Sequence, residues 1–295
     1  MRKINIKKLS IVAVMAIPVV LFAQEQSSPE PVKNAFEHST LINSNTTETH
    51  GNHSLDVAIQ HRFGAMDKFD DLYGVYAPSN IRLYIGYGIT KDISVGIGSC
   101  KANNNFDFSW RYKILQQKTS GMPVSVTYVG NVARKFVKDE KMLNMKNEFN
   151  QLNKITYYNE LMVSRKFNSH LSLQVGAYCA YYNLLDSASF SGQHIFFGAS
   201  AVGRYKFSPQ SSILVEYNLP LADNKDMPKA TKPMPNLGIG IEVSTGNHQF
   251  QIFVCNASGI LSQDARVYNN SDLTNLSIPA WLIGFNITRQ WGFSK

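Results

Sequence analysis

Charged side chains recur at every second position along several segments of this chain. In residues 106–114, FDFSWRYKI, Asp107, Arg111 and Lys113 alternate with aromatic and aliphatic residues. A period of two places successive side chains on opposite faces of a β-strand. Because burying Arg111 and Lys113 in a dry core would cost much free energy, the pattern predicts a polar inner face that encloses water. Charges on such a face could bind or select small polar solutes.

The same alternation assigns nine charged residues to this inner face. They are Asp56, Arg62, Arg82, Asp107, Arg111, Glu160, Arg204, Glu216 and Glu242. Both signs are present, so the set predicts either a lumen plugged by cross-strand ion pairs or a narrow pore of mixed polarity. Charges that only solvate and brace the lumen fit the pattern at least as well as charges that set selectivity.

Motifs for catalysis or cofactor binding are missing from the sequence. It has no glycine-rich phosphate loop after a strand, no HExxH, no CxxC and no GxSxG. The histidines near the first predicted strand are His38, His50, His53 and His61. Their spacing matches no metal-ligand template beyond the pair His53 and His61, and solvated imidazoles are the favoured interpretation. We therefore expect no metal, no cofactor and no enzymatic activity.

One catalytic alternative is an outer-membrane lipid hydrolase, because some of these enzymes carry a histidine and a serine two residues apart on one strand. His170 and Ser172 have this spacing, which places both on one face of a strand. The predicted wiring puts His170 at a periplasmic turn, facing the lumen and far from outer-leaflet lipid. No acidic or amide partner can be assigned, so hydrolysis is the weakest functional hypothesis.

The elements that position these side chains are predicted β-strands. In residues 80–99, Ile81, Leu83 and Ile85 alternate with polar residues and glycine, and a polar break at 90–92 predicts a tight turn. Later segments repeat this pattern with no helix to cover the apolar face, so that face is expected to meet lipid. Short turns alternate with long loops, which is typical of outer-membrane barrels. The fold class is therefore all-β, an antiparallel transmembrane barrel of about 12 strands.

The loop from Arg134 to Asn153 is long and charged. Met142, Met145 and Phe149 have near-helical spacing within it, so we expect a helical turn. Its length and charge are tolerated only outside the bilayer, and we predict that it is extracellular.

The N-terminus predicts the compartment. Four basic residues precede the apolar run LSIVAVMAIPVVLFA, and a polar stretch begins at Gln24. This is the pattern of a secretory signal cleaved after Ala23, and the run is shorter than the ~20 residues of a spanning helix. The predicted organisation is a signal peptide at 1–23, a polar N-terminal extension at 24–53 and an outer-membrane barrel at 54–295. The expected location is the cell outer membrane.

Charge and cysteine content limit the partners. Four of the 29 lysines and arginines lie in the leader, which leaves 25 against 21 acidic residues, too small an excess to indicate nucleic acid. Cys100, Cys179 and Cys255 are far apart and odd in number, so isolated buried or lipid-facing thiols are favoured over a disulfide framework, although one pair could bridge. The expected partners are outer-membrane lipid, small solutes if the lumen is open, and the barrel-assembly machinery during biogenesis.

A resemblance supports the fold and the compartment. STLINSNTTET at 39–49, LDVAIQHRFG at 55–64, the hairpin at 81–98 and WRYKILQQ at 110–117 together resemble an uncharacterised family of outer-membrane β-barrel proteins of Gram-negative bacteria, catalogued as a domain of unknown function. The resemblance implies a membrane barrel and brings no activity, ligand or site. Phe293 is followed by two further residues, a small departure from the usual terminal aromatic of outer-membrane proteins.

Two functional hypotheses therefore remain open, a narrow pore for small solutes and a non-transporting binding or scaffold barrel. Glycine and serine on the inner face of 93–100 and 237–244 leave room for a pore, which is narrowly preferred. The scaffold is favoured by the same charges, since Arg62, Arg82 and Arg111 could pair with Asp107, Glu216 or Glu242, and the N-terminal extension could plug the lumen. Twelve strands do not decide, because eight fill a barrel and ~16 open a channel.

Overall fold

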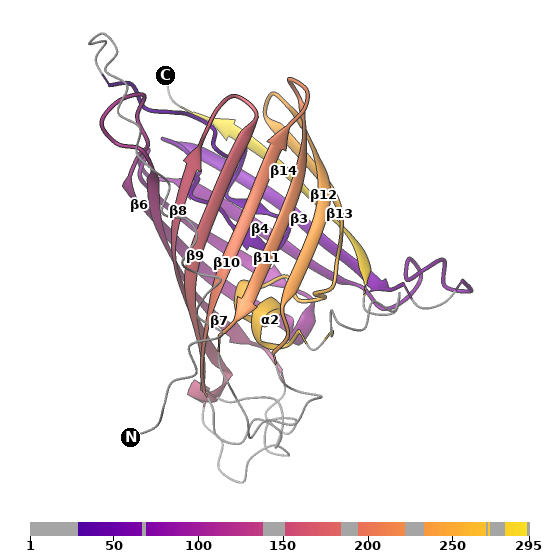
Figure 1. The fold of residues 1–295 in the computed structure, drawn as a ribbon. Helices are drawn as coiled ribbons and strands as arrows, with labels where there is room; N and C mark the ends of the chain where they lie inside the picture. Colours follow the sequence, from indigo (N-terminus) through magenta and orange to yellow (C-terminus); the bar gives the residue numbers. More distant parts are fainter. Residues whose placement is uncertain are drawn as a thin grey trace, which may run out of the picture.

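Twelve antiparallel strands close into a barrel in the computed structural model, which describes residues 29–66, 69–137, 151–183, 194–221, 233–269, 271 and 281–293. The strands follow chain order around the wall, and the last pairs with the first (Figure 1). They are β3 (Ser54–Ala65), β4 (Asn80–Gly88), β5 (Ile93–Cys100), β6 (Asn105–Leu115), β7 (Ser125–Lys135), β8 (Ile155–Lys166), β9 (Leu171–Tyr182), β10 (Ile195–Lys206), β11 (Ser211–Pro220), β12 (Asn236–Thr245), β13 (His248–Cys255) and β14 (Leu282–Gly292). The predicted fold class and strand number are confirmed, whereas the leader and its cleavage site lie outside the described residues.

The outer face of the wall is apolar. On β4, Leu83 and Ile85 are exposed while Tyr84 between them is buried, and on β13 Ile252 is 66% exposed between the buried side chains of Gln251 and Phe253. Exposed aliphatic side chains at every second position would be costly in water and are favourable in lipid. The period-two pattern thus sorts each strand into a lipid-facing row and an inner row. No helix of the described chain is long and apolar enough to cross a membrane.

The two ends of the barrel differ. Short turns connect β4 to β5, β8 to β9, β10 to β11 and β12 to β13 at one end, the top in Figure 1, where β14 also ends. We call this end the turn side and the opposite end, with the longer connections, the loop side. The segment 138–150 falls outside the described residues, so the helical turn and the extracellular placement expected there stay predictions.

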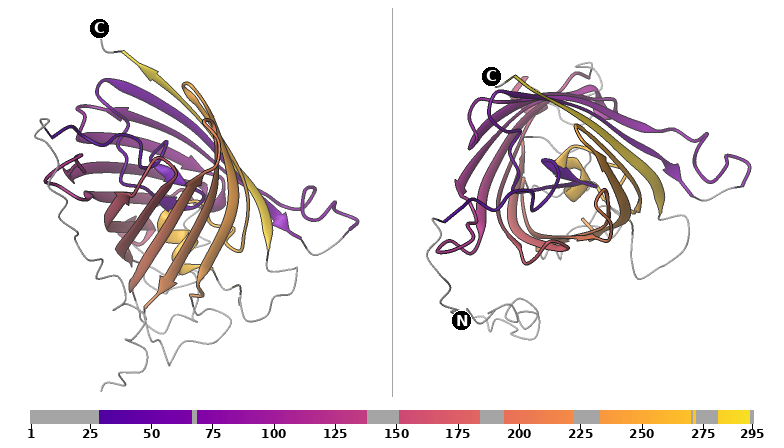
Figure 2. Two further views of the ribbon diagram at one scale, coloured as in Figure 1. Left: turned by 45° about the horizontal axis from the view of Figure 1, so that its top comes forward. Right: turned by 90° about the horizontal axis from the view of Figure 1, so that it is seen from above.

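The N-terminal segment, residues 29–53, enters the lumen from the turn side. Its hairpin consists of β1 (Thr40–Leu41) and β2 (Ser44–Asn45), which pair with each other and not with the wall. The view along the barrel in Figure 2 shows this indigo segment inside the ring of strands. The segment that the sequence marked as a polar extension therefore fills the inside of the barrel over most of its described length.

A short helix enters from the loop side. α2 (Ser262–Val267) follows β13, and all of its residues except Ser262 are buried. Figure 2 shows it within the ring, beside the N-terminal hairpin. No helix was predicted here from the sequence. Two short 3₁₀ turns, η2 (Ala102–Asn104) and η3 (Gln151–Lys154), precede β6 and β8.

Apolar contacts inside the barrel join these inserted elements to the wall. One cluster contains Phe36, Leu41 and Ile42 of the N-terminal segment together with wall residues such as Leu214 and Phe253. A second cluster, Tyr158, Tyr178, Ala180, Tyr182, Phe196 and Val267, joins α2 to β8, β9 and β10. The three cysteines are free thiols, two of them buried. The lumen is thus packed rather than open along its length.

Candidate functional site

The inner row of the wall carries the nine charged residues that the alternation assigned to it. Each side chain lies inside the barrel and is shielded from bulk water, with Arg62 and Glu216 fully buried. A buried charge is stable only when hydrogen-bonded or paired. The hydrogen-bond or ion-pair partner of each charged side chain therefore shows which groups the inner face of the wall binds.

Two pairs are made within the wall itself. Arg82 Nη2 lies 2.6 Å from Asp107 Oδ2 and its Nε donates to Oδ1 at 3.1 Å, a bidentate pair. Arg204 Nε donates to Glu242 Oε1 at 2.8 Å. Among the cross-lumen pairs that the sequence suggested for Arg62, Arg82 and Arg111, only the one between Arg82 and Asp107 forms among the described residues.

Asn43, at the tip of the N-terminal hairpin, joins two wall charges that do not pair directly. Its Oδ1 accepts hydrogen bonds from Arg62 Nε and Nη2 at 3.0 and 2.8 Å. Its Nδ2 donates to Glu216 Oε1 at 2.8 Å, and its backbone N–H donates to Oε2 at 2.9 Å. One neutral amide thus satisfies a guanidinium and a carboxylate at once.

Asn45 repeats this arrangement two residues later. Its Oδ1 accepts from Arg111 Nη2 at 2.7 Å, and its Nδ2 donates to Glu160 Oε2 at 2.8 Å. The carbonyl of Thr46 accepts a further bond from Arg111 Nη1 at 3.1 Å. Asn43 and Asn45 therefore act as amide adaptors, each placed between a wall arginine and a wall glutamate.

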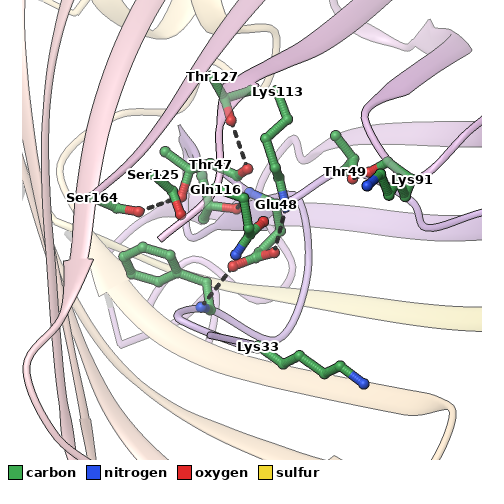
Figure 3. A network of polar contacts seen from close by, with 12 residues as sticks. Lys33, Thr47, Glu48, Thr49, Lys91, Lys113, Gln116, Ser125, Thr127 and Ser164 are labelled. Carbon is green, nitrogen blue, oxygen red and sulfur yellow. Dashed lines mark hydrogen bonds and ion pairs between the residues drawn. The ribbon is translucent and has the colours of Figure 1, made fainter. Parts of the chain in front are cut away.

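Residues 47–49, which lead from the hairpin back toward the turn side, make further polar contacts with the wall. Thr47 N–H donates to Gln174 Oε1 at 2.8 Å, and the Thr47 carbonyl accepts from Thr127 Oγ1 at 2.8 Å. Figure 3 shows Glu48 reaching Lys113, 3.3 Å away, while Thr49 donates to the carbonyl of Lys91 at 2.8 Å. These three residues contact different parts of the wall, so the segment is held from several sides of the barrel.

His50 lies near the end of the N-terminal segment that leads into β3, and we call this end the base of the segment. Its Nδ1 lies 2.7 Å from Asp56 Oδ2 and its Nε2 lies 3.0 Å from the Tyr84 hydroxyl, and His38 Nδ1 is 3.6 Å from the same carboxylate oxygen. The ring is only 1% exposed, so the expectation of a solvated imidazole is wrong here. Burial lowers the pKa of His50 although the hydrogen bond to Asp56 opposes this shift.

Two glycines of β4 make room for this base. A side chain at Gly86 would collide with the His50 ring, and one at Gly88 would collide with the carbonyl of Gly51. Both glycines lie on the inner row of β4. The close approach of the His50 ring at Gly86 and of a second backbone at Gly88 explains why these positions lack side chains.

On the loop side, α2 inserts three polar side chains into the wall. Gln263 Nε2 donates to Asn131 Oδ1 at 3.0 Å, and Asp264 accepts from Tyr182 Oη at 2.7 Å. Arg266 lies against the rings of Tyr158 and Tyr178. The two inserted elements meet where Asn45 Nδ2 lies 3.3 Å from Ser262 Oγ.

One small polar cavity of about 50 Å³ lies between the inserted elements and the strands β3, β4, β6, β7, β8 and β14. Its lining includes His50, Asp56, Arg82, Tyr84, Arg111 and Asn131. This volume holds a few water molecules and no larger solute. No group of three or more His, Cys, Asp or Glu side chains within the described ranges is arranged to hold a metal ion.

A family model described as a membrane bound beta barrel domain (DUF5777) matches residues 36–291. The chain belongs to this family. The match includes the N-terminal hairpin and α2 as well as the wall, and it confirms the family resemblance read from the sequence.

Solved outer-membrane proteins share the fold of this DUF5777 barrel at low sequence identity. The NanC porin superposes with a TM-score of 0.50 at 13% identity, covering 79% of this chain and 97% of the porin. An outer-membrane channel from Pseudomonas putida F1 also gives 0.50, at 11% identity, covering 82% of this chain and 96% of the channel. No curated protein matches the sequence. The protein is a β-barrel of the outer membrane, as predicted.

His170 and Ser172 do not form a catalytic pair in this DUF5777 barrel. His170 is exposed at the turn between β8 and β9, and its Nδ1 bonds the carbonyl of Lys206 at 2.7 Å. It does not face the lumen, contrary to the prediction, whereas Ser172 is buried on the inner row. The alternation of β9 begins only after the turn, which explains the difference.

Proposed function

We propose that this outer-membrane barrel is a channel for small polar solutes, closed in the described state by the N-terminal segment of its own chain. The observation that carries the proposal is the pairing of the wall charges. A barrel meant to be solid would pair its charges within the wall, as Arg82 does with Asp107. Arg62, Glu216, Arg111 and Glu160 instead receive neutral amide partners from the N-terminal segment.

A lumen without that segment would be polar and lined partly by small residues. The inner row of β5 consists of Ser94, Gly96, Gly98 and Cys100, and that of β12 includes Gly238 and Gly240. At Gly238 this space is shared by Ile42 of the N-terminal segment, whereas at Gly96 and Gly98 it is taken by side chains of the wall itself. With arginines and glutamates exposed on the same wall, the solutes that fit are small and polar. Lipid around the apolar outer face, and the barrel-assembly machinery during biogenesis, are the other partners we propose.

Single-channel conductance in planar bilayers tests the proposal. The intact protein should conduct only in brief openings, whereas a variant lacking residues 34–50 should conduct steadily at all voltages. Heat-modifiable gel mobility checks that the variant barrel is folded. As a control, a synthetic peptide of residues 34–50 added on the turn side should close the variant again. A folded deletion variant without conductance would rule the channel out.

The second candidate is a non-transporting binding or scaffold barrel. It is favoured by the tight filling at the place where the inserted elements meet, since the cavity between them and the wall measures only about 50 Å³. In that case the N-terminal segment is part of the core, and its deletion should abolish folding rather than open a pore. The deletion variant therefore separates the two candidates. Transport is proposed rather than catalysis, because His170 is exposed at a turn whereas Ser172 is buried on the inner row.

A further inference from the structure

We propose that Tyr158, Tyr178 and Glu160 form a binding site for a small organic cation, and that Arg266 of α2 occupies this site in the closed barrel. The site lies on the inner row of β8 and β9. We call these three residues the tyrosine cage. Binding of a cation depends on the cage alone, while its role in selecting solutes rests on the proposed channel function.

The register of the wall builds the tyrosine cage. Glu160 of β8 pairs directly with Tyr178 of β9, and Tyr158 lies two residues from Glu160 on the same inner row. The two rings are stacked with centroids 5.9 Å apart. Arg266 Cζ lies 5.3 Å from the Tyr158 centroid and 5.0 Å from the Tyr178 centroid. Both distances are typical of cation–π contacts.

Arg266 is an imperfect occupant of this cage. Its Nη2 is 3.7 Å from Glu160 Oε1, longer than a hydrogen bond, and its Nη1 reaches only the carbonyl of Ser262 in its own helix, at 3.2 Å. Its Nε and Nη2 and the Tyr178 hydroxyl have no hydrogen-bond partner within the described chain, although all are buried. Arg62 contrasts with it, since every nitrogen of that guanidinium is bonded.

The unmet hydrogen bonds define a better ligand. A free cation that can shift toward Glu160 could donate to this carboxylate and to the Tyr178 oxygen while keeping its contact with both rings. Guanidinium and substituted ammonium groups suit such a site because they are weakly hydrated and bind aromatic faces. Glu160 disfavours anions, and aromatic rings give a poor coordination shell for a strongly hydrated alkali ion. The class that fits is a small organic cation.

Glu160 links the cage to the N-terminal segment. Its Oε2 accepts from Asn45 Nδ2 and from the Tyr158 hydroxyl, both at 2.8 Å, and its Oε1 accepts from Ser200 Oγ at 2.7 Å. A cation that pairs with Glu160 competes with Asn45 for the carboxylate. Occupancy of the cage by a solute from the loop side would therefore weaken one of the two amide adaptors.

The test is titration calorimetry on the full chain purified in detergent, with methylguanidinium chloride as the probe and neutral methylurea as its matched control. Arg266→Ala should bind methylguanidinium at a single saturable site and should not bind methylurea. The wild type should bind at least tenfold more weakly because Arg266 competes. Adding Tyr178→Leu to Arg266→Ala should weaken binding by about tenfold, the value of one cation–π contact at a desolvated site.

Three results would overturn the site: no saturable binding to Arg266→Ala, equal binding to the wild type, or binding unchanged by Tyr178→Leu. Heat-modifiable mobility confirms that each variant is folded, and Arg266→Met supplies a second background that keeps an apolar stem in place. Calorimetry measures binding without any ion current, so the proposed cation site and the proposed channel are tested independently. Binding in a barrel that never conducts would rule out only the channel, and conductance without binding would rule out only the cage.

Discussion

The two elements that fill the lumen meet its wall in different ways. The N-terminal segment presents neutral amides, and Asn43 and Asn45 each satisfy one wall arginine and one wall glutamate. α2 presents a charged side chain, Arg266, whose Nε and Nη2 are left without a hydrogen bond within the described chain. The two asparagines are matched to the wall donor for acceptor, whereas Arg266 is held mainly by aromatic contact while its neighbours Gln263 and Asp264 are hydrogen-bonded to the wall.

The difference indicates which element seals the barrel and which can be exchanged. When Asn43 or Asn45 moves out of the lumen into water, the segment itself carries no unpaired charge. The wall arginine and glutamate that the amide had bonded are then left without this partner and need water in its place. The seal is therefore strong while the lumen is dry and weak once water enters. Arg266, in contrast, can be replaced by any cation of the right shape without exposing an unpaired charge.

Removing both amide adaptors should have the largest effect on the closed state of the barrel. Asn43→Ala with Asn45→Ala leaves Arg62, Glu216, Arg111 and Glu160 short of partners, at a cost of roughly 1–3 kcal/mol for each buried group. We expect the segment to leave the lumen and the double variant to conduct continuously in planar bilayers. Asn52→Ala, which removes an exposed asparagine of the same segment, should stay closed. A closed double variant would show that the apolar cluster around Phe36 and Ile42 is the actual seal.

Charge reversal on the uncovered wall should have a smaller effect, on selectivity alone. In the variant without residues 34–50, Arg111→Glu places a negative charge where Asn45 was bound, so the reversal potential in a salt gradient should shift toward that of the cation. Lys91→Glu makes the same change of charge at an exposed turn and should shift it little. Equal shifts in both variants would mean that Arg111 does not face the conducting path.

The wall could be predicted from the sequence because its information is local. A period of two along each strand assigned residues such as Leu83 to lipid and Glu216 to the inside, and the structure places both so. Neighbouring strands are also neighbours in the chain, so no long-range pairing other than β14 with β3 had to be inferred.

The filling could not be predicted in the same way. Asn43 bonds Glu216 across 173 positions of the chain, and β1 and β2 have two residues each, too few to show a period. α2 has six residues, fewer than two helical turns, so its insertion depends on tertiary contacts. The signals present were indirect: Gly86 marks where the His50 ring approaches the wall, and Gly88 marks where a second backbone does.

The smallest expected effect is a pH dependence of the seal, which comes from its base. His50 is neutral and buried beside Asp56, Tyr84, Arg111 and His38, and burial lowers its pKa from the ordinary value of 6.5.

Once the segment is released into water, His50 regains that ordinary pKa and binds a proton more readily than in the sealed barrel. The contribution of neutral His50 to the sealed state is therefore fully present above pH 6.5 and is lost as the pH falls below it. The open probability of the intact protein should rise on acidification from pH 7.5 to 5. His50→Gln should flatten this dependence, whereas His53→Gln, at an exposed position, should preserve it. An open probability that rises equally in the wild type and in His50→Gln would show that His50 does not control the seal.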